Sequence, residues 1–269
     1  ISGVAGAIAI GGPGTIFWMW ISALLGMCTK FAEVTLAVHF RETNDHGEFV
    51  GGPMYYIKNG LSKNWHFLAY LFSAFGVLTV FGTGNATQVN TITTAIDSAL
   101  LNFHIIPDSS VSTVNLVLGI IIAIVVGLVL LGGIKRIGKV TEKLVPFMAL
   151  FYISASLYIV ICNIQNAPAV FSSIIRSAFS LRSAAGGIGG AALGKCISIG
   201  FKRGVFSNEA GLGSTVLVGS SSNVKEPAIQ GMWGIFQVFV DTTVICTVTA
   251  FVLLSTTVNA VPLSTAIDN

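Results

Sequence analysis

Long apolar segments, separated by short polar connections, set the pattern of this sequence. A helix needs about 20 mostly apolar residues to cross a bilayer core of roughly 30 Å, and six segments are long enough. They are Thr15–Phe40, Trp65–Ile96, Thr113–Leu131, Leu144–Cys162, the glycine-rich and interrupted Ala184–Gly219, and Met232–Ser255. Apolar residues occur all round these segments, whereas the strands of a membrane barrel would alternate with a period of two. The pattern predicts an all-α polytopic membrane protein, with residues 1–269 in a single transmembrane domain.

The two ends of the sequence suggest a piece of a longer protein. The chain begins with Ile1 rather than Met, inside an apolar stretch, and ends shortly after the sixth segment. Ile1–Ile10 is too short to span, and the GGPG sequence that follows is typical of a turn. We therefore expect residues 1–14 to be the end of a helix begun upstream and the turn after it.

Composition and charge exclude several classes of protein. Charged residues make up 9% of the chain and hydrophobic residues 53%, whereas about 25% of an average soluble domain is charged. So few polar groups cannot cover a water-facing surface, which excludes a soluble enzyme, a disordered tail and a nucleic-acid binder. Membrane lipid is an expected partner, and a multi-pass location in the cell membrane follows. Lys and Arg gather after the first, third and fifth segments, which predicts that these connections are cytoplasmic.

Polar side chains at membrane depth are costly and tend to mark a pathway or a site. Lys30 and Glu33 are three residues apart on the first segment, and we interpret them as a structural pair whose charged ends reach toward the cytoplasmic interface. The second segment becomes polar at GTGNATQVNTITTA, where Gln88 and Thr91 share a helix face. These residues either form helix–helix contacts, as small and amide residues do in membranes, or line a cavity.

The fifth segment carries the strongest signal. Lys195, Lys202, Arg203 and Glu209 interrupt a stretch that is otherwise apolar enough to cross. A broken helix would handle these charges better than a continuous one, because unwound carbonyl groups and half-helix ends bind ions and an anionic carboxylate. We expect the break within Lys202–Gly211, with Ser207 and Asn208 as N-cap residues of a second half-helix. The alternative is a cytoplasmic loop followed by a short re-entrant helix.

Asp241 is the acidic residue of the sixth segment, and no Lys or Arg lies within two turns of it. Its partner must be a cation, a proton or a group on another helix. The adjacent Thr242 and Thr243 suit a hard cation, which favours oxygen ligands, but hydroxyl groups could equally donate hydrogen bonds to the carboxylate. The sequence has no nucleophile–base pair and no Cys/His metal-ligand spacing, so we expect neither an enzyme nor a bound cofactor.

Three stretches resemble one known family. GGPGTIFWMWISALLGMCTKFAEVTLAVHFRE, GGPMYYIKNGL and GFKRGVFSNEAGLGS occur in the order found in the alanine/glycine:cation symporters, the prokaryotic amino-acid carriers. The resemblance implies a partial LeuT-like inverted-repeat fold, in which Ile1–Ile10 is the outer half of core helix one and the six segments are core helices two to seven. One departure is Ser214-Thr215-Val216, where the family usually has Ser-Ala-Pro.

The resemblance also implies a function and a site. It implies sodium-coupled symport of alanine or glycine by alternating access, with the sodium ion as the coupling ion. The residues matching the substrate site are Gln88, Phe206, Ser207 and Asn208, and those matching a sodium site are Asp241 and Thr242. Two other functions stay open: proton-coupled transport with Asp241 or Glu209 as the proton carrier, and an amino-acid sensor in the membrane that transports nothing.

Overall fold

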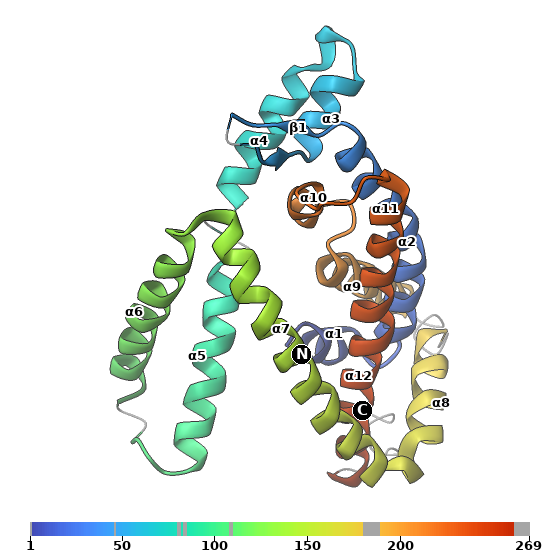
Figure 1. The fold of residues 1–269 in the computed structure, drawn as a ribbon. Helices are drawn as coiled ribbons and strands as arrows, with labels where there is room; N and C mark the ends of the chain where they lie inside the picture. Colours follow the sequence, from blue (N-terminus) through green and yellow to red (C-terminus); the bar gives the residue numbers. More distant parts are fainter. Residues whose placement is uncertain are drawn as a thin grey trace. The chain divides into compact units, whose positions relative to one another are not determined.

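The computed structural model describes residues 2–45, 47–79, 82, 85–107, 110–179 and 189–260, and these are mostly helical (Figure 1). The α-helices are α1 (Ser2–Gly11), α2 (Thr15–His39), α3 (Pro53–Gly60), α4 (Phe67–Thr79), α5 (Asn85–Asn102), α6 (Val111–Leu130), α7 (Gly133–Cys162), α8 (Ala167–Ala178), α9 (Gly189–Asn208), α10 (Ser214–Ser220), α11 (Pro227–Val238) and α12 (Cys246–Ala260). Short 3-10 turns lie at Lys63–Trp65 and Ile164–Asn166, and a π-helix, Phe239–Ile245, joins α11 to α12.

Within the described residues, four helices are long and apolar enough to cross a membrane, which agrees with the prediction of a helical membrane protein. They are Thr15–His39, Val111–Leu130, Arg136–Cys162 and Pro227–Thr256. Where the sequence predicts one segment over Trp65–Ile96, the structure has α4 and α5, with residues 80, 81, 83 and 84 outside the described part. Where it predicts the interrupted segment Ala184–Gly219, the structure has α9 and α10, and residues 184–188 are likewise not described.

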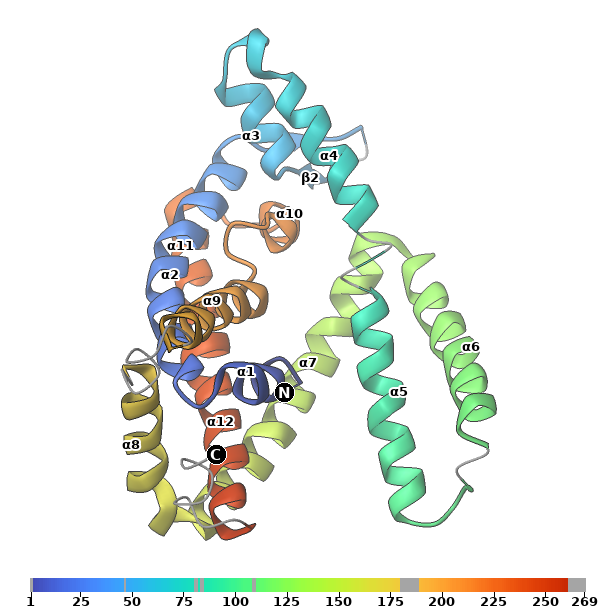
Figure 2. The same cartoon turned by 180° about the vertical axis from the view of Figure 1, so that it is seen from behind.

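The chain divides into two compact units, Ile1–Tyr70 with Ile153–Asn269, and Leu71–Tyr152. In the first unit α2 lies side by side with α11, and α9 also packs on it (Figures 1 and 2). Glycine allows the approach of α11, since a Cβ atom at Gly231 would lie 2.8 Å from the Phe31 ring. Small residues are what membrane helices use to pack backbones closely.

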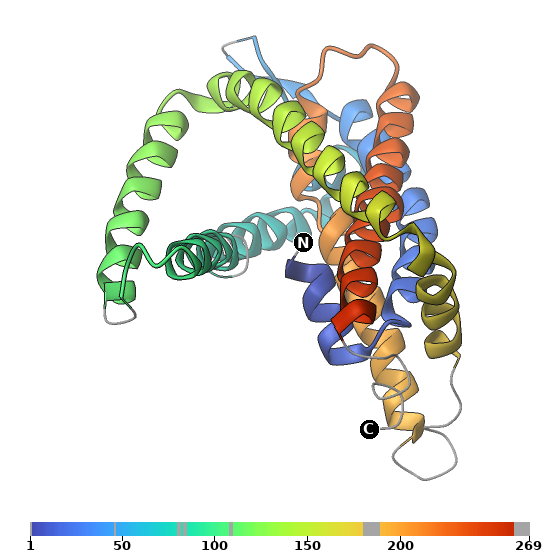
Figure 3. The ribbon, with the colours of Figure 1, turned by 90° about the horizontal axis from the view of Figure 1, so that it is seen from below.

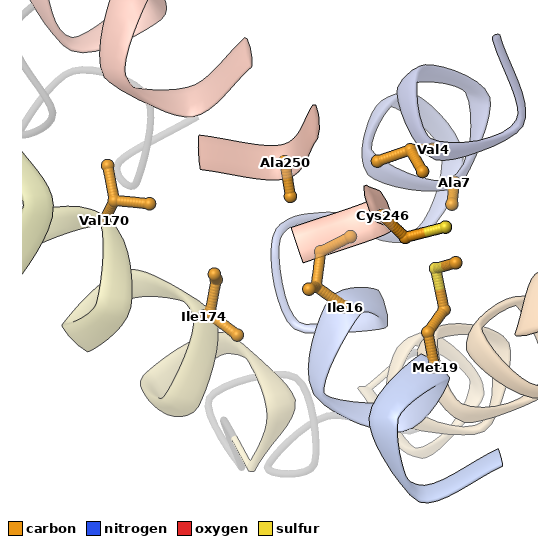
Figure 4. Packing of buried hydrophobic residues seen from close by; sticks show 8 residues of the cluster. All are labelled: Val4, Ala7, Ile16, Met19, Val170, Ile174, Cys246 and Ala250. Carbon is orange, nitrogen blue, oxygen red and sulfur yellow. The ribbon is translucent and has the colours of Figure 1, made fainter. Parts of the chain in front are cut away.

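A hydrophobic cluster joins one end of this unit, where α1 and α8 meet α2 and α12. Figure 4 shows the side chains that point into it: Val4, Ala7, Ile16, Met19, Val170, Ile174, Cys246 and Ala250. Each of them is less than a tenth exposed. Figure 3 shows α1 beside α12 from another direction. This packing fixes the start of α12, and with it the π-helix that precedes it.

The connection after α2 is the one part of the described structure that is not helical or a simple loop. Strands β1 (Glu42–Thr43) and β2 (Phe49–Val50) pair antiparallel, with Glu42 opposite Val50. Just before them, Arg41 donates hydrogen bonds of 2.6–3.1 Å to the carbonyl groups of Ser220, Ser222 and Val224. Its guanidinium also lies 3.8 Å from the centre of the Phe49 ring. The hairpin is thereby attached to the end of α10.

The second unit contains the rest of α4, then α5, α6 and the first part of α7. Helices α5 and α6 are in contact with each other. The large apolar side chains of α6, such as Leu116, Ile120 and Ile124, are more than half exposed. Such a surface suits contact with lipid or with further helices.

Candidate functional site

The polar feature at the centre of the first unit is the interruption between α9 and α10. The last α9-type hydrogen bond runs from the Glu209 N–H to the Val205 carbonyl, at 2.8 Å. Beyond it the backbone turns left-handed three times, with φ of 54° at Glu209, 87° at Gly211 and 78° at Gly213. Helix α10 then begins at Ser214. The structure therefore has an interruption over Glu209–Gly213, where the sequence predicts one within Lys202–Gly211.

The predicted roles of Ser207 and Asn208 as N-cap residues are wrong. Both residues belong to the last turn of α9, and the residue before α10 is the left-handed Gly213. The error matters electrostatically. The carboxyl end of a helix carries unpaired carbonyl groups and a partial negative charge. Ser207 and Asn208 therefore lie at an end that attracts a cation, not at one that attracts a carboxylate.

Asp241 lies in the π-helix between α11 and α12. Here the Cys246 N–H donates to the Asp241 carbonyl group, five residues back, so the turn holds one residue more than in an α-helix. Single π-helical turns are rare and occur frequently at functional sites. The Asp241 side chain is partly buried, and Thr242 beside it is fully buried.

Hydroxyl groups from two helices surround the Asp241 carboxylate. Ser207 Oγ donates a hydrogen bond of 2.5 Å to Asp241 Oδ2, and Thr242 Oγ1 donates one of 3.3 Å to the same atom. Ser207 Oγ also lies 3.5 Å from Cys246 Sγ. No described residue donates a hydrogen bond to Asp241 Oδ1. One oxygen of the carboxylate is thus held by the protein, and the other is free to receive a cation or a proton.

The π-helix is also held from α2. Trp20 Nε1 donates a hydrogen bond of 2.7 Å to Thr247 Oγ1, and that hydroxyl donates in turn to the Thr243 carbonyl group at 2.5 Å. Trp20 and Thr247 are far apart in the sequence, so sequence reasoning does not predict the hydrogen bond between them. It fixes the turn that carries Asp241 against the neighbouring helix.

Asn208 combines deep burial with an unpaired donor. Its side chain is 1% exposed, and its Oδ1 accepts the Ala210 N–H at 3.0 Å. That bond fixes which amide atom is the oxygen, so Nδ2 is the group that finds no acceptor among the described residues. Leaving a buried donor unpaired costs about 1–3 kcal/mol. Nδ2 is thus a buried donor on the side of α9 that faces α2, where a Cβ atom added at Gly26 would lie 3.2 Å from it.

The other two residues predicted for the substrate site are both exposed. Phe206 is 47% exposed, and its side chain points about 100° round α9 from that of Ser207. Gln88 lies on α5 in the second unit, where its side chain is exposed. The structure brings Ser207, Asp241 and Thr242 together, with Asn208 next along α9.

The structure also corrects the prediction that Lys30 and Glu33 pair with each other and reach toward the interface. They do not form an ion pair with each other among the described side chains, and Lys30 is 0% exposed, so it does not extend to the interface. Lys30 Nζ donates to the Glu209 carbonyl group at 3.2 Å and to Thr215 Oγ1. Glu33 Oε2 accepts the Gly211 N–H at 3.1 Å. Both charges bind the interruption.

Comparison with known proteins decides the family. The family model of the sodium:alanine symporter family matches residues 1–267. The chain belongs to this family. The sodium/alanine symporter AgcS of Methanococcus maripaludis is 42% identical over 264 residues, which cover 97% of this chain and 55% of that protein. An uncharacterized transporter of Haemophilus influenzae is 45% identical over 257 residues, which cover 95% of this chain and 54% of that protein.

A third member of the sodium:alanine symporter family, the amino-acid carrier protein AlsT of Bacillus subtilis, is 40% identical over 257 residues, covering 94% of this chain and 51% of that protein. The chain thus spans about half the length of these relatives. The family and its named members are transporters rather than enzymes, as the sequence predicts. The resemblance noted from the three sequence stretches is confirmed.

Proposed function

We propose that the protein containing this chain is a sodium-coupled symporter of a small neutral amino acid, alanine or glycine, in a cell membrane. The observation that carries the proposal is the half-satisfied carboxylate of Asp241. Two hydroxyl groups hold its Oδ2, and Oδ1 receives no hydrogen bond from a described residue. Membership of the sodium:alanine symporter family supports sodium and alanine as the transported species.

The coupling ion would bind at Asp241. Sodium is a hard cation and prefers oxygen ligands, and the Oδ1 atom, the Thr242 hydroxyl and the carbonyl end of α9 supply them. Membership of the sodium:alanine symporter family is why we place sodium coupling before proton coupling.

The amino acid would bind at the same end of α9. The partial negative charge of the helix end suits its ammonium group, and the unpaired Asn208 Nδ2 suits its carboxylate. Phe206 would provide an apolar surface for a short side chain, and Gln88 of α5 would add a polar contact. Ser207 and Asn208 lie at the carboxyl end of α9, whereas the sequence predicts them at the start of the second half-helix, which begins at Ser214.

The fold we propose for the whole protein is the LeuT-like inverted repeat, working by alternating access. Two features support it: the helix interrupted at Glu209–Gly213, and the packing of α1 against α9 and α12 beside Asp241. In this assignment residues 1–14 are the outer half of core helix one and its turn. The segments 15–40, 65–96, 113–131, 144–162, 184–219 and 232–255 are core helices two to seven of a single transmembrane domain.

Proton coupling through Glu209 is disfavoured by its contacts. Ser214 Oγ donates a 2.5 Å hydrogen bond to Glu209 Oε2, and Lys30 binds the carbonyl group of the same residue. Glu209 is thus part of the interruption, whereas Asp241 keeps one carboxylate oxygen to which no described residue donates. Asp241 is the better proton carrier if coupling is to protons.

Uptake of labelled alanine by proteoliposomes that contain the full-length protein tests the proposal. An inward sodium gradient should drive accumulation, while an inward proton gradient with potassium in place of sodium should not. Accumulation driven by protons alone would favour the proton-coupled alternative. Alanine binding without any uptake would favour a sensor. Protein-free vesicles and labelled glycine complete the comparison.

A further inference from the structure

Two backbone groups of the interruption are bound by side chains of α2, while the N–H groups of Ala210 and Leu212 are bonded within the segment itself. A break in a helix frees carbonyl and N–H groups, which take side chains, nearby backbone groups or water as partners. Here the Glu209 carbonyl group receives the Lys30 ammonium at 3.2 Å, and the Gly211 N–H donates to Glu33 at 3.1 Å. The carbonyl oxygen is thus bound by a positive charge, and the N–H group by a negative charge.

Burying the Lys30 ammonium costs free energy unless other groups stabilise its charge. A fully buried ammonium loses its hydration, and partners must compensate it. Its partners are the Glu209 carbonyl group and the Thr215 hydroxyl, which lie on either side of the interruption. Glu33 lies one turn further along α2 and binds the peptide between them. The two side chains therefore contact both ends and the middle of the break.

The strained backbone of Glu209 is a second indication that neighbouring groups hold the interruption in place. A non-glycine residue with φ of 54° is uncommon and persists when the surrounding structure holds it there. The hydrogen bond from Lys30 holds the carbonyl group of this residue, and the hydrogen bond from Ser214 holds its side chain. Without these contacts the chain after Asn208 would be free to adopt other turns.

We propose that Lys30 and Glu33 are positioning residues, which form a charge clamp that fixes the interruption between α9 and α10 against α2. Asn208 and Ser207 directly precede the clamped residues, so the clamp sets the geometry of the proposed binding site. Only the effect of the clamp on substrate binding rests on the proposed transport function. The clamp itself consists of side-chain contacts to the backbone of the interruption.

Hydrogen–deuterium exchange of the full-length protein tests the clamp independently of transport. Glu33→Ala removes the acceptor of the Gly211 N–H, so this one amide, followed in peptides covering 209–213, should exchange on the order of tenfold faster, as expected for the loss of a hydrogen bond to a charged group. Glu33→Gln keeps an acceptor oxygen and should restore slow exchange. Glu226→Ala, an exposed residue before α11, is the matched control and should not alter these peptides. Unchanged exchange in Glu33→Ala would overturn the clamp.

Alanine uptake by the same variants tests the positioning role. Glu33→Ala should raise the KM for alanine on the order of tenfold, with recovery in Glu33→Gln and no effect in Glu226→Ala. Faster exchange with an unchanged KM would show a structural contact only and would overturn the positioning role. If wild-type protein fails to transport alanine, the proposed function fails, while the exchange result still decides the clamp. Thr215→Val, which removes one Lys30 partner at a half-buried site, is the second variant if Glu33→Ala does not fold.

Discussion

Replacing Gly200 by alanine should separate α9 from α2. Gly200 and Gly204 are four residues apart in α9 and face α2, in the spacing that lets membrane helices approach closely. A Cβ atom at Gly200 would lie 2.5 Å from the Trp18 Cβ atom and 2.7 Å from the Thr15 carbonyl oxygen. The carbonyl oxygen is part of the backbone, so no side-chain rotation relieves the second contact.

The size of the effect follows from that distance. The contact must grow from 2.7 Å to at least 3.4 Å, an ordinary van der Waals separation, and the helices must move to allow it. Overpacking of this kind costs about 1–3 kcal/mol. Ser207 lies two turns further along α9 on the way to Asp241, so the same movement should also weaken the apparent affinity for sodium.

Gly194→Ala on the same helix is the matched control, because a Cβ atom there meets nothing within 4 Å. Alanine favours a helix over glycine by about 1 kcal/mol, so this variant should be no less stable than wild type. The free energy of unfolding, measured in detergent by circular dichroism with added denaturant, compares the variants. Equal stability of Gly200→Ala and Gly194→Ala would refute the close packing of α9 on α2.

Three other outcomes are expected. Arg41→Lys should lower the free energy of unfolding by about 1–3 kcal/mol, because a compact ammonium lacks the spread, planar N–H groups with which the guanidinium reaches three carbonyl groups, and unchanged thermal stability would contradict this. Gln88→Ala should weaken alanine binding by about 1–3 kcal/mol in a folded protein, and unchanged affinity by calorimetry would remove Gln88 from the site. Hydrogen bonds from Asn59 and then Lys58 hold the pKa of Glu42 below its usual value. The small stabilisation that results is present above a pH of about 4.3 and is lost as the pH falls through the lowered pKa, so Asn59→Ala should flatten the acid side of a stability–pH curve.

The apolar pattern sufficed to predict the helical membrane fold, because 20-residue apolar runs have few other uses. It predicts one segment over Trp65–Ile96 that becomes polar in its second half, and the structure describes an apolar α4 and a more polar α5 there. It could not show the π-helix at Asp241. One extra residue in a turn changes the backbone but leaves the order of apolar residues almost as it was.

The interruption of the fifth segment could be located from its charges, but its polarity could not. Ser and Asn are good N-cap residues, yet Asn208 uses its side chain to bind the Ala210 N–H beyond the end of α9. The residue that ends the helix is Glu209, and a left-handed glutamate leaves no signal in the sequence. The Asn208 side chain therefore binds a backbone N–H group at the carboxyl end of α9, not at the amino end of a helix.

The spacing of Lys30 and Glu33 placed both on one face of α2, as the structure has them. Their backbone partners could not be predicted, because these groups lie 179 residues from Lys30 and 178 from Glu33 and are freed only by the break. Likewise, Ser207 meets Asp241 across 34 residues. Such contacts depend on how α9 crosses α2, which local patterns do not encode.

The dependence of alanine uptake on sodium and pH in the Asp241→Asn variant of the full-length protein tests the central claim most directly. Asparagine keeps an oxygen ligand and removes the negative charge. Under sodium coupling, the sodium concentration for half-maximal uptake should rise on the order of tenfold, equivalent to about 1.4 kcal/mol of lost cation binding, while uptake at saturating sodium persists. A sodium curve identical to that of wild type would contradict the account, as would a variant that loses only its pH dependence.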